Sequence, residues 1–272
     1  EENVNMLSFN HLGCMGQLGN QMFQYAALRG IAENKGYDFT VPNHKKIFDD
    51  GLGNKLRIEI FDCFHLYNVR HTGMLHNGHA PVIQEKHFHF DKSLFDLCPD
   101  EISLSGFFQS ENWFKNIESS IREDFTFYDE IMIPCKEMMD DIDNAVSLHV
   151  RRGDFLVNSA NHNNLGLDYY EEALSKFDDD RQVIVFSDDP EWCKEQSLFE
   201  NDRFLVAEGN VNYVDMCLMS FCTGHIIANS SFSWWGAWLA KSRKVIAPKN
   251  WFGENLKNND TKDIYLEDWE VV

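Results

Sequence analysis

The sequence has few basic residues, and this shortage limits the partners it can have. Its 24 Lys and Arg stand against 44 Asp and Glu, which gives a formal net charge of −20. A negative surplus of this size repels polyanions, so it argues against nucleic acid or an anionic membrane surface as the general partner. An anionic ligand can be held only where positive charge is concentrated locally.

Long apolar runs and regularly spaced cysteines are also missing. No hydrophobic run approaches the ~20 residues of a membrane span, and no secretory signal precedes the first expected strand, so no integral membrane segment is expected. The seven cysteines are odd in number, lack Cys-x-x-Cys spacing and lie mostly among apolar residues. This pattern is typical of buried thiols in a reduced protein rather than of disulfides or zinc, and it predicts a soluble, cytoplasmic protein.

Without proline-rich linkers, repeats or low-complexity tracts, domains must be inferred from the order of strands and helices. The 272 residues can bury one large core or two ordinary ones, and two are favoured. In the second half, short β-favouring runs alternate with helical patterns, which predicts right-handed βαβ crossovers and a parallel α/β sheet. The expected strands are 145–150, 182–187, 204–206, 225–228 and 245–247, and the expected helices are 168–177, 191–198, 213–222 and 232–241.

The first half has a looser pattern. A strand over 7–12, a loop with glycines at 13, 16 and 19 and a helix over 20–35 resemble the opening of a nucleotide-binding domain, although the spacing is not GxGxxG. A strand over 103–109 and a helix over 113–127 are also expected. Because residues 139–144 are acidic and Met6 resembles a natural start, we predict an N-terminal domain at 6–142 and a C-terminal domain at 143–272.

Two other features of the composition favour a plain structural interpretation. Six histidines between positions 65 and 89 lack metal-ligand spacing, so no metal site is predicted there. Tryptophans at 234, 235 and 238 recur at helical spacing in an apolar segment, which predicts core packing rather than stacking on a sugar.

Polar clusters follow the expected strands at their carboxyl ends, where ligands bind in open α/β sheets. Arg151, Arg152 and Asp154 follow the first strand of the second half, and Asp188 follows the second. Residues 229–231, Asn-Ser-Ser, lie at a helix start, where free N–H groups favour a phosphate. Arginine pairs bidentately with phosphate, so a diphosphate is predicted between the arginines and this helix. The alternatives are an Arg-Asp structural salt bridge, or that Ser231 only caps its helix and Asp188 or Asp189 only caps another.

Four ordered motifs resemble those of the α1,2-fucosyltransferases of glycosyltransferase family 11. They span residues 16 to 237, and together they are highly specific. The motifs are Gly16-Gln17-Leu18-Gly19-Asn20-Gln21-Met22-Phe23-Gln24-Tyr25-Ala26, His149-Val150-Arg151-Arg152-Gly153-Asp154, Val185-Phe186-Ser187-Asp188-Asp189 and Asn229-Ser230-Ser231-Phe232-Ser233-Trp234-Trp235-Gly236-Ala237.

The resemblance implies a GT-B fold, with two Rossmann-like domains facing across a cleft and the C-terminal one binding GDP-fucose. It implies an inverting transfer of L-fucose from GDP-β-L-fucose to O2 of a terminal galactose in an oligosaccharide acceptor. Neither a metal nor another cofactor is expected, since Arg151 can supply the positive charge that Mg²⁺ supplies in other transferases.

The resemblance also assigns roles to single residues. Arg151 is expected at the β-phosphate with Ser230 and Ser231 beside it, while Asp215 and His149 are expected to hold the guanine. The expected donor site also includes Arg152 and Asp188, and Asn20 is expected to reach across the cleft towards the phosphate or the acceptor.

Two positions of the second motif leave their roles open. Asp154 is the nearest candidate for a general base in the sequence, but it is equally suited to orient Arg151 or Arg152. The aromatic position of this motif is Phe155 instead of the commoner Tyr, which removes a hydroxyl.

Three alternatives to this function remain. One is a protein O-fucosyltransferase or another GDP-sugar-dependent transferase. The second is a metal-dependent GT-A enzyme with Asp141-Ile142-Asp143 as its DxD site, although that run precedes a strand instead of ending one. The third is a catalytically silent protein that binds a GDP-sugar or a glycan, which the intact Arg151 and serine cluster argue against.

Overall fold

The computed structural model describes residues 4–240 and 243–272, which belong to two compact α/β units. One unit comprises Glu1–Tyr128 with Asn259–Tyr265, and the other comprises Asp129–Asn258 with Leu266–Val272. The sequence-based division at 142/143 assigned helix α5 (Asp129–Met139) to the first domain, whereas α5 packs against α9 (Asn212–Ser220) of the second unit. There Cys135 Sγ lies 3.8 Å from the carbonyl oxygen of Val214.

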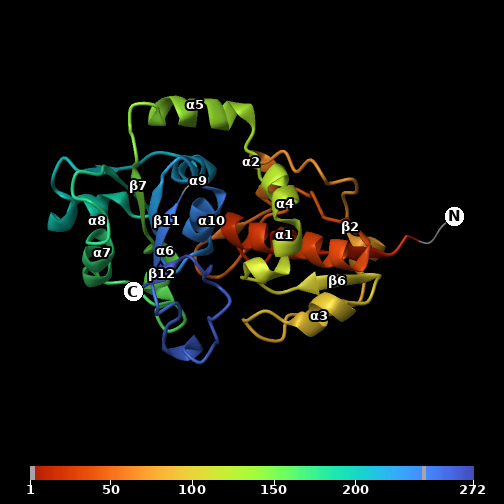
Figure 1. Ribbon diagram of the computed structural model, residues 1–272. Coiled ribbons are helices and arrows are strands. Elements are labelled where there is room, and N and C mark those ends of the chain that lie inside the picture. The colour runs from red at the N-terminus through yellow and green to blue at the C-terminus, as the bar shows by residue number, and fades with distance from the viewer. Residues whose placement is uncertain (1–3, 241–242) are drawn as a thin grey trace. The chain divides into compact units, whose positions relative to one another are not determined.

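The first unit contains a four-stranded parallel sheet in the order β2-β1-β6-β5 (Figure 1). Its strands are β1 (Met6–Ser8), β2 (Asp38–Thr40), β5 (Val82–Gln84) and β6 (Ile102–Ser105), and β3 (Phe48–Asp49) pairs antiparallel with β4 (Lys55–Leu56). Its helices are α1 (Leu18–Lys35), α2 (Ile60–Cys63), α3 (Lys92–Leu97) and α4 (Glu118–Asp124), with 3₁₀ turns η1 (Leu75–Gly78), η2 (Glu111–Trp113) and η3 (Lys115–Ile117).

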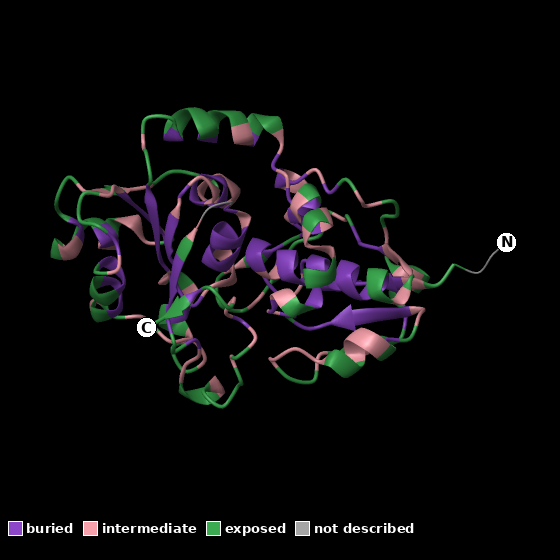
Figure 2. Cartoon of the chain, viewed as in Figure 1, coloured by how far each residue is buried: buried purple, intermediate pink, exposed green. Residues whose placement is uncertain are grey.

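Helix α1 is the buried centre of the first unit, as its colour in Figure 2 shows. It ends at Gly36 with φ 68°, as predicted from the sequence, because a left-handed residue closes a helix at low cost when it has no Cβ. The predicted helix over 113–127 is wrong in its first half. The Trp113 ring packs edge-on against Phe90 and Phe108, and the chain there forms two 3₁₀ turns before α4 begins.

The second unit contains six parallel strands in the order β12-β11-β10-β7-β8-β9. They are β7 (Val146–Val150), β8 (Val183–Ser187), β9 (Phe204–Val206), β10 (Gly224–Ile226), β11 (Lys244–Ala247) and β12 (Glu270–Val271). In chain order this is the Rossmann arrangement 3-2-1-4-5-6. The parallel sheet predicted from the sequence is confirmed, and its topological switch point lies between β7 and β10.

Helices cover both faces of this sheet. They are α6 (Gly153–Val157), α7 (Leu167–Leu174), α8 (Pro190–Lys194), α9 and α10 (Ser231–Leu239), with 3₁₀ turns η4 (Ser197–Phe199) and η5 (Glu254–Leu256). The predicted helix over 232–241 included Lys241, which lies outside the described residues.

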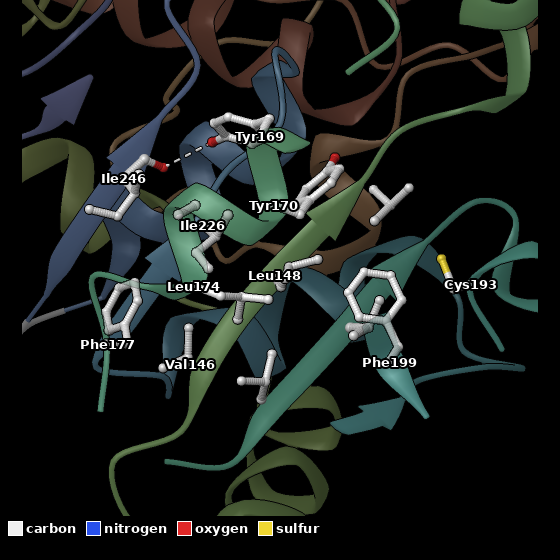
Figure 3. Packing of buried hydrophobic residues seen from close by; sticks show 14 residues of the cluster. Val146, Leu148, Tyr169, Tyr170, Leu174, Phe177, Cys193, Phe199, Ile226 and Ile246 are labelled. Atoms are coloured by element: carbon white, nitrogen blue, oxygen red, sulfur yellow. Dashed lines mark hydrogen bonds between the residues drawn. The ribbon is translucent and has the colours of Figure 1, made fainter. Parts of the chain in front are cut away.

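The pleat of β7 separates the two faces. Val146, Leu148 and Val150 join the apolar cluster that packs against α7, which Figure 3 shows. His149 points to the opposite face, because successive strand residues alternate, and it contacts α10 there. The tryptophans of α10 are fully buried, with Trp234 and Trp235 packed edge-on, which confirms the predicted core packing.

The cysteines and the longest apolar helices were also the subject of predictions from the sequence. All seven cysteines are free thiols and six are buried, as expected. Over residues 4–240 and 243–272 no helix combines the length and apolarity needed to cross a membrane. The same residues contain no group of three His, Cys, Asp or Glu side chains arranged to hold a metal ion.

Candidate functional site at the switch point of the second sheet

The carboxyl ends of β7 and β10 bring the predicted phosphate motifs to one place in the second unit. Arg151 directly follows β7, and Ser230 precedes the first residue of α10 after β10. His149 Nδ1 lies 2.8 Å from Ser233 Oγ, and the same hydroxyl oxygen accepts from the Ala228 N–H at 3.1 Å. These contacts hold the first turn of α10 against the end of β7, so both motifs border the switch point.

Arg151 is held by two carboxylates. Its Nη2 donates to Asp154 Oδ1 at 2.5 Å, and its Nη1 lies 3.2 Å from Asp188 Oδ2. The guanidinium carbon also lies 5.3 Å from the centre of the Phe155 ring. With only 19% of its side chain exposed, Arg151 has a defined orientation. The salt bridge considered as an alternative from the sequence is therefore present, and it leaves the guanidinium at the strand end.

Gly153 is required by the position of Asp188. A Cβ at 153 would lie 2.3 Å from Asp188 Oδ2, so any side chain there would displace the carboxylate. Asp188 Oδ1 accepts the Arg152 backbone N–H at 2.8 Å. The glycine of the Arg-Arg-Gly-Asp run thus lets one carboxylate bind both the Arg152 backbone and the Arg151 guanidinium.

Arg152 has a separate set of contacts. Its Nε donates to Asp189 Oδ2 at 3.1 Å, and its guanidinium lies 3.9 Å above the Trp192 ring. Asp189 also caps α8 by accepting from the Trp192 N–H at 3.3 Å. These contacts serve the fold, and the predicted donor-binding role of Arg152 stays a prediction.

The two residues predicted to hold guanine lie in different environments. His149 is 4% exposed, and burial together with Arg151 lowers its pKa to about 3, so its ring is neutral. Asp215 lies in the first turn of α9, where burial raises its pKa to about 6 and Asn210 Nδ2 donates to it at 2.9 Å. Because α9 follows β9 in a parallel sheet, its first turn is at the carboxyl edge.

Residues 229–231, where the chain enters α10, have distinct roles. Ser230 is the cap of α10, since its Oγ accepts from the Phe232 N–H at 3.3 Å, whereas the sequence-based alternative gave that role to Ser231. Ser231 is the first helical residue. Asn229 is buried, and its Nδ2 donates to the carbonyls of Asn163 and Trp251 at 2.8 and 2.9 Å.

Asn20 lies in the first unit, in the first turn of α1. Its Oδ1 accepts from Gln109 Nε2 at 2.8 Å. A Cβ at Gly16 would come within 2.5 Å of Asn20 Nδ2, which explains the glycine four residues earlier in that motif. The predicted contact of Asn20 with phosphate or acceptor stays a prediction.

Sequence reasoning missed His162. Its ring stacks on Phe155 with centroids 4.1 Å apart and planes 1° apart. It lies in a segment that the sequence analysis left as irregular structure, with no spacing that links it to Arg151. The sole signal was the aromatic position at 155, whose role was left open.

Comparison with solved structures identifies the architecture. A crystal structure of the NodZ α-1,6-fucosyltransferase soaked with GDP-fucose superposes with a TM-score of 0.55 at 11% identity, covering 88% of this chain and 93% of that one. At this identity the likeness shows the fold alone. The fold is GT-B, built from two Rossmann-like units.

Sequence relatives are closer. An O-antigen biosynthesis glycosyltransferase, WbnK, of Escherichia coli is 29% identical, covering 92% of this chain and 97% of the relative. An α-1,2-colitosyltransferase of Escherichia coli is 33% identical, covering 90% of this chain and 92% of the relative. A galactoside α-(1,2)-fucosyltransferase 1 of Alouatta caraya is 27% identical, covering 83% of this chain and 63% of the relative.

The model of glycosyl transferase family 11 matches residues 5–272. That match includes all four sequence motifs, the strand ends that carry them and the switch point that they border. The chain therefore belongs to glycosyl transferase family 11.

Proposed function

We propose that this protein transfers L-fucose from GDP-β-L-fucose to O2 of a terminal galactose, with inversion to an α1,2 linkage. One observation carries the proposal: Arg151 and the Ser230–Ser231 helix start border the switch point of a Rossmann sheet, the place where such sheets bind nucleotides. The α1,2 linkage is also supported by the names of the colitosyltransferase and fucosyltransferase relatives.

Arg151 would stabilise the departing diphosphate. Breaking the bond between fucose C1 and oxygen develops negative charge on GDP and oxocarbenium character on the sugar. A guanidinium held in advance by Asp154 and Asp188 does not have to reorganise when that charge appears, so it favours the transition state over the ground state. The N–H groups at the start of α10 would bind the same diphosphate, since a nine-residue helix directs its positive end there.

The remaining site residues would bind the rest of the donor. Asp215 is suited to accept from guanine N–H groups and His149 borders the same edge, while Arg152 and Asp188 complete the donor side. The bond from Arg151 to Asp154 Oδ1 favours an orienting role for Asp154 over that of a general base. Without a strong base, the acceptor hydroxyl oxygen would attack a sugar cation that has already largely separated from GDP, and its proton would pass to water as the new C1–O bond forms.

Neither a metal nor another cofactor is part of this proposal. Arg151 and the α10 start would supply the charge stabilisation that Mg²⁺ supplies in metal-dependent transferases. Transfer that persists in excess EDTA supports this assignment. Loss of transfer in EDTA, restored by Mg²⁺ or Mn²⁺, contradicts it.

A colitose donor is a second candidate, because a relative of 33% identity is named as a colitosyltransferase. The deciding experiment offers GDP-fucose and GDP-colitose separately, with a glycan array and a set of folded peptide domains as acceptors. We expect fucose transfer to galactose-terminated glycans, and the carbon–proton coupling at the new anomeric centre should identify the α linkage. Transfer only from GDP-colitose, or only to peptide hydroxyls, contradicts the proposed donor or acceptor.

A further inference from the structure

His162 is fixed beside the proposed diphosphate site by its own loop. Residues 158–166 are bound to residues 250–255 by the Gly253 N–H to the Asn161 carbonyl at 2.9 Å and the Asn255 N–H to the Ala160 carbonyl at 2.8 Å. A bridge between His162 and Phe252 continues this pairing. The imidazole then stacks on Phe155, whose ring also faces the Arg151 guanidinium.

The charged side chains around the carboxyl end of β7 do not by themselves favour binding of a diphosphate. Two guanidinium groups, of Arg151 and Arg152, are paired with three carboxylates, of Asp154, Asp188 and Asp189. Two positive and three negative groups leave one net negative charge. A sugar-nucleotide diphosphate adds two more, so positive charge in addition to the N–H groups at the start of α10 would strengthen its binding.

His162 is the titratable group placed to supply that charge. Among the residues that the structure describes, none hydrogen-bonds its ring nitrogens. Burial lowers its pKa, with Asp154 acting to raise it and Arg151 to lower it, so the ring is mostly neutral before a ligand binds. His149 cannot take this role, because its pKa of about 3 keeps it neutral.

Other charges near His162 are few. Its own loop, 158–166, contains no other charged residue. On and beside the segment packed against that loop, Lys249 is exposed, and Glu254 and Lys257 are exposed and pair with each other. Asp154 and Arg151 are thus the charged groups that influence its ring, and both belong to the proposed site.

We propose that His162 is a further donor-binding residue, whose imidazole takes up a proton when the diphosphate of the sugar nucleotide binds and then pairs with it. This inference rests on the proposed function. A second anionic group near the ring raises the proton affinity of the imidazole, and by linkage the protonated ring strengthens donor binding. The gain in affinity is complete below the pKa of the free protein and is lost as the pH rises through the pKa of the complex.

Calorimetric titration with GDP-fucose tests the proposal. This donor has no phosphate that titrates near neutral pH, so the observed enthalpy in buffers of different ionisation enthalpy reports protons taken up by the protein. We expect proton uptake at pH 7 and an affinity that weakens on the order of ten-fold between pH 6.5 and 8.5, since one proton binding links at most ten-fold per pH unit. His162→Phe, which keeps a ring on Phe155 but no nitrogen, should lose both effects.

His162→Asn is the second variant, and thermal melting confirms that each variant is folded. Equal proton uptake and equal pH dependence in the wild-type protein and a folded variant would overturn the role of His162 alone. Failure of the wild-type protein to bind GDP-fucose would overturn the proposed donor, and the His162 proposal with it.

Discussion

The His149 ring and the Ser233 hydroxyl form a 2.8 Å hydrogen bond that joins strand β7 to helix α10. Because the pKa of His149 is about 3, the ring stays neutral throughout the physiological range, and the contact does not change with pH. The two motifs that border the switch point are therefore held together by a bond between uncharged groups. The charged side chains of the motif after β7, those of Arg151, Arg152 and Asp154, take no part in this bond.

Replacing Arg151 by Ala should remove most of the activity without unfolding the protein. Loss of one preorganised donor to the leaving group typically costs about 2.7–4 kcal/mol in the barrier, so we expect kcat to fall about 10²–10³-fold. Steady-state kinetics with GDP-fucose measure this, with Lys194→Ala as the control, since that lysine is in a surface ion pair with Glu208. A kcat close to wild type would remove Arg151 from its proposed role.

Asp154→Asn distinguishes the two roles considered for this carboxylate. The asparagine oxygen can still accept from Arg151 Nη2. If Asp154 only orients Arg151, kcat should therefore fall on the order of ten-fold in Asp154→Asn and further in Asp154→Ala. If Asp154 is the general base, kcat should be almost abolished in both variants. Near-equal and severe kcat losses for Asn and Ala would therefore restore Asp154 as the base.

Gly153→Ala should impair donor use through Asp188. The added Cβ would displace the carboxylate that binds the Arg152 backbone and Arg151, so we expect kcat/KM for the donor to fall about ten-fold with little change in Tm. Gly166→Ala is the matched control, because its Cβ would lie 2.4 Å from the carboxylate of Asp168, an exposed residue. Equal effects of the two variants would speak against a specific role for Gly153.

The affinity for GDP-fucose should fall in acid because of Asp215. Burial raises the pKa of this carboxyl to about 6, and guanine N–H groups can pair only with its ionised form. The contribution of Asp215 to binding should therefore be complete well above pH 6 and should be lost as the pH falls through 6, below the range in which His162 is expected to act. Fluorescence titration from pH 5 to 7 measures this, and Asp215→Asn should bind more weakly, with a flatter profile. An unchanged acid limb in Asp215→Asn would exclude Asp215 as its source.

Asp124 should be a major determinant of stability in the first unit. It is fully buried, pairs with Arg29 at 2.7 Å, and accepts from the Tyr25 hydroxyl at 2.5 Å and the Asn68 N–H at 2.9 Å. Asp124→Ala leaves the Arg29 charge without its carboxylate, so we expect a loss of about 3–5 kcal/mol in the free energy of unfolding. Asp96→Ala, in an exposed pair with Lys92, should change it by less than about 0.5 kcal/mol. Similar denaturant midpoints for the two variants would contradict the expectation.

The sequence predicted the second sheet well because its strands are short, apolar and separated by helical patterns. It missed β12, a two-residue strand, since so short a segment has no periodicity. It also missed α5, where Pro134 lies inside the helix. The broken helix after Trp113 could not be foreseen, because the break follows from packing against Phe90 and Phe108.

At the site, too, features set by local sequence were predicted, and features set by contacts between distant residues were missed. Arg151, Asp188 and Ser230 lie where strand ends predicted them, since position after a strand is a local property of the sequence. The contact of His162 with Phe155 is not local, because it depends on how the 158–166 loop is held by residues far along the chain. No spacing rule links such residues.

Asn229 joins the parts of the second unit that surround the proposed site. Its buried carboxamide donates to Asn163 in one loop and to Trp251 in another, so neither loop can detach without leaving a buried donor unsatisfied. The two loops should consequently open as one cooperative unit in hydrogen exchange, with similar protection for the Gly253 and Asn255 amides. Amino-acid substitutions in one of these loops are then constrained by the sequence of the other. The two segments around His162 should therefore change together in evolution.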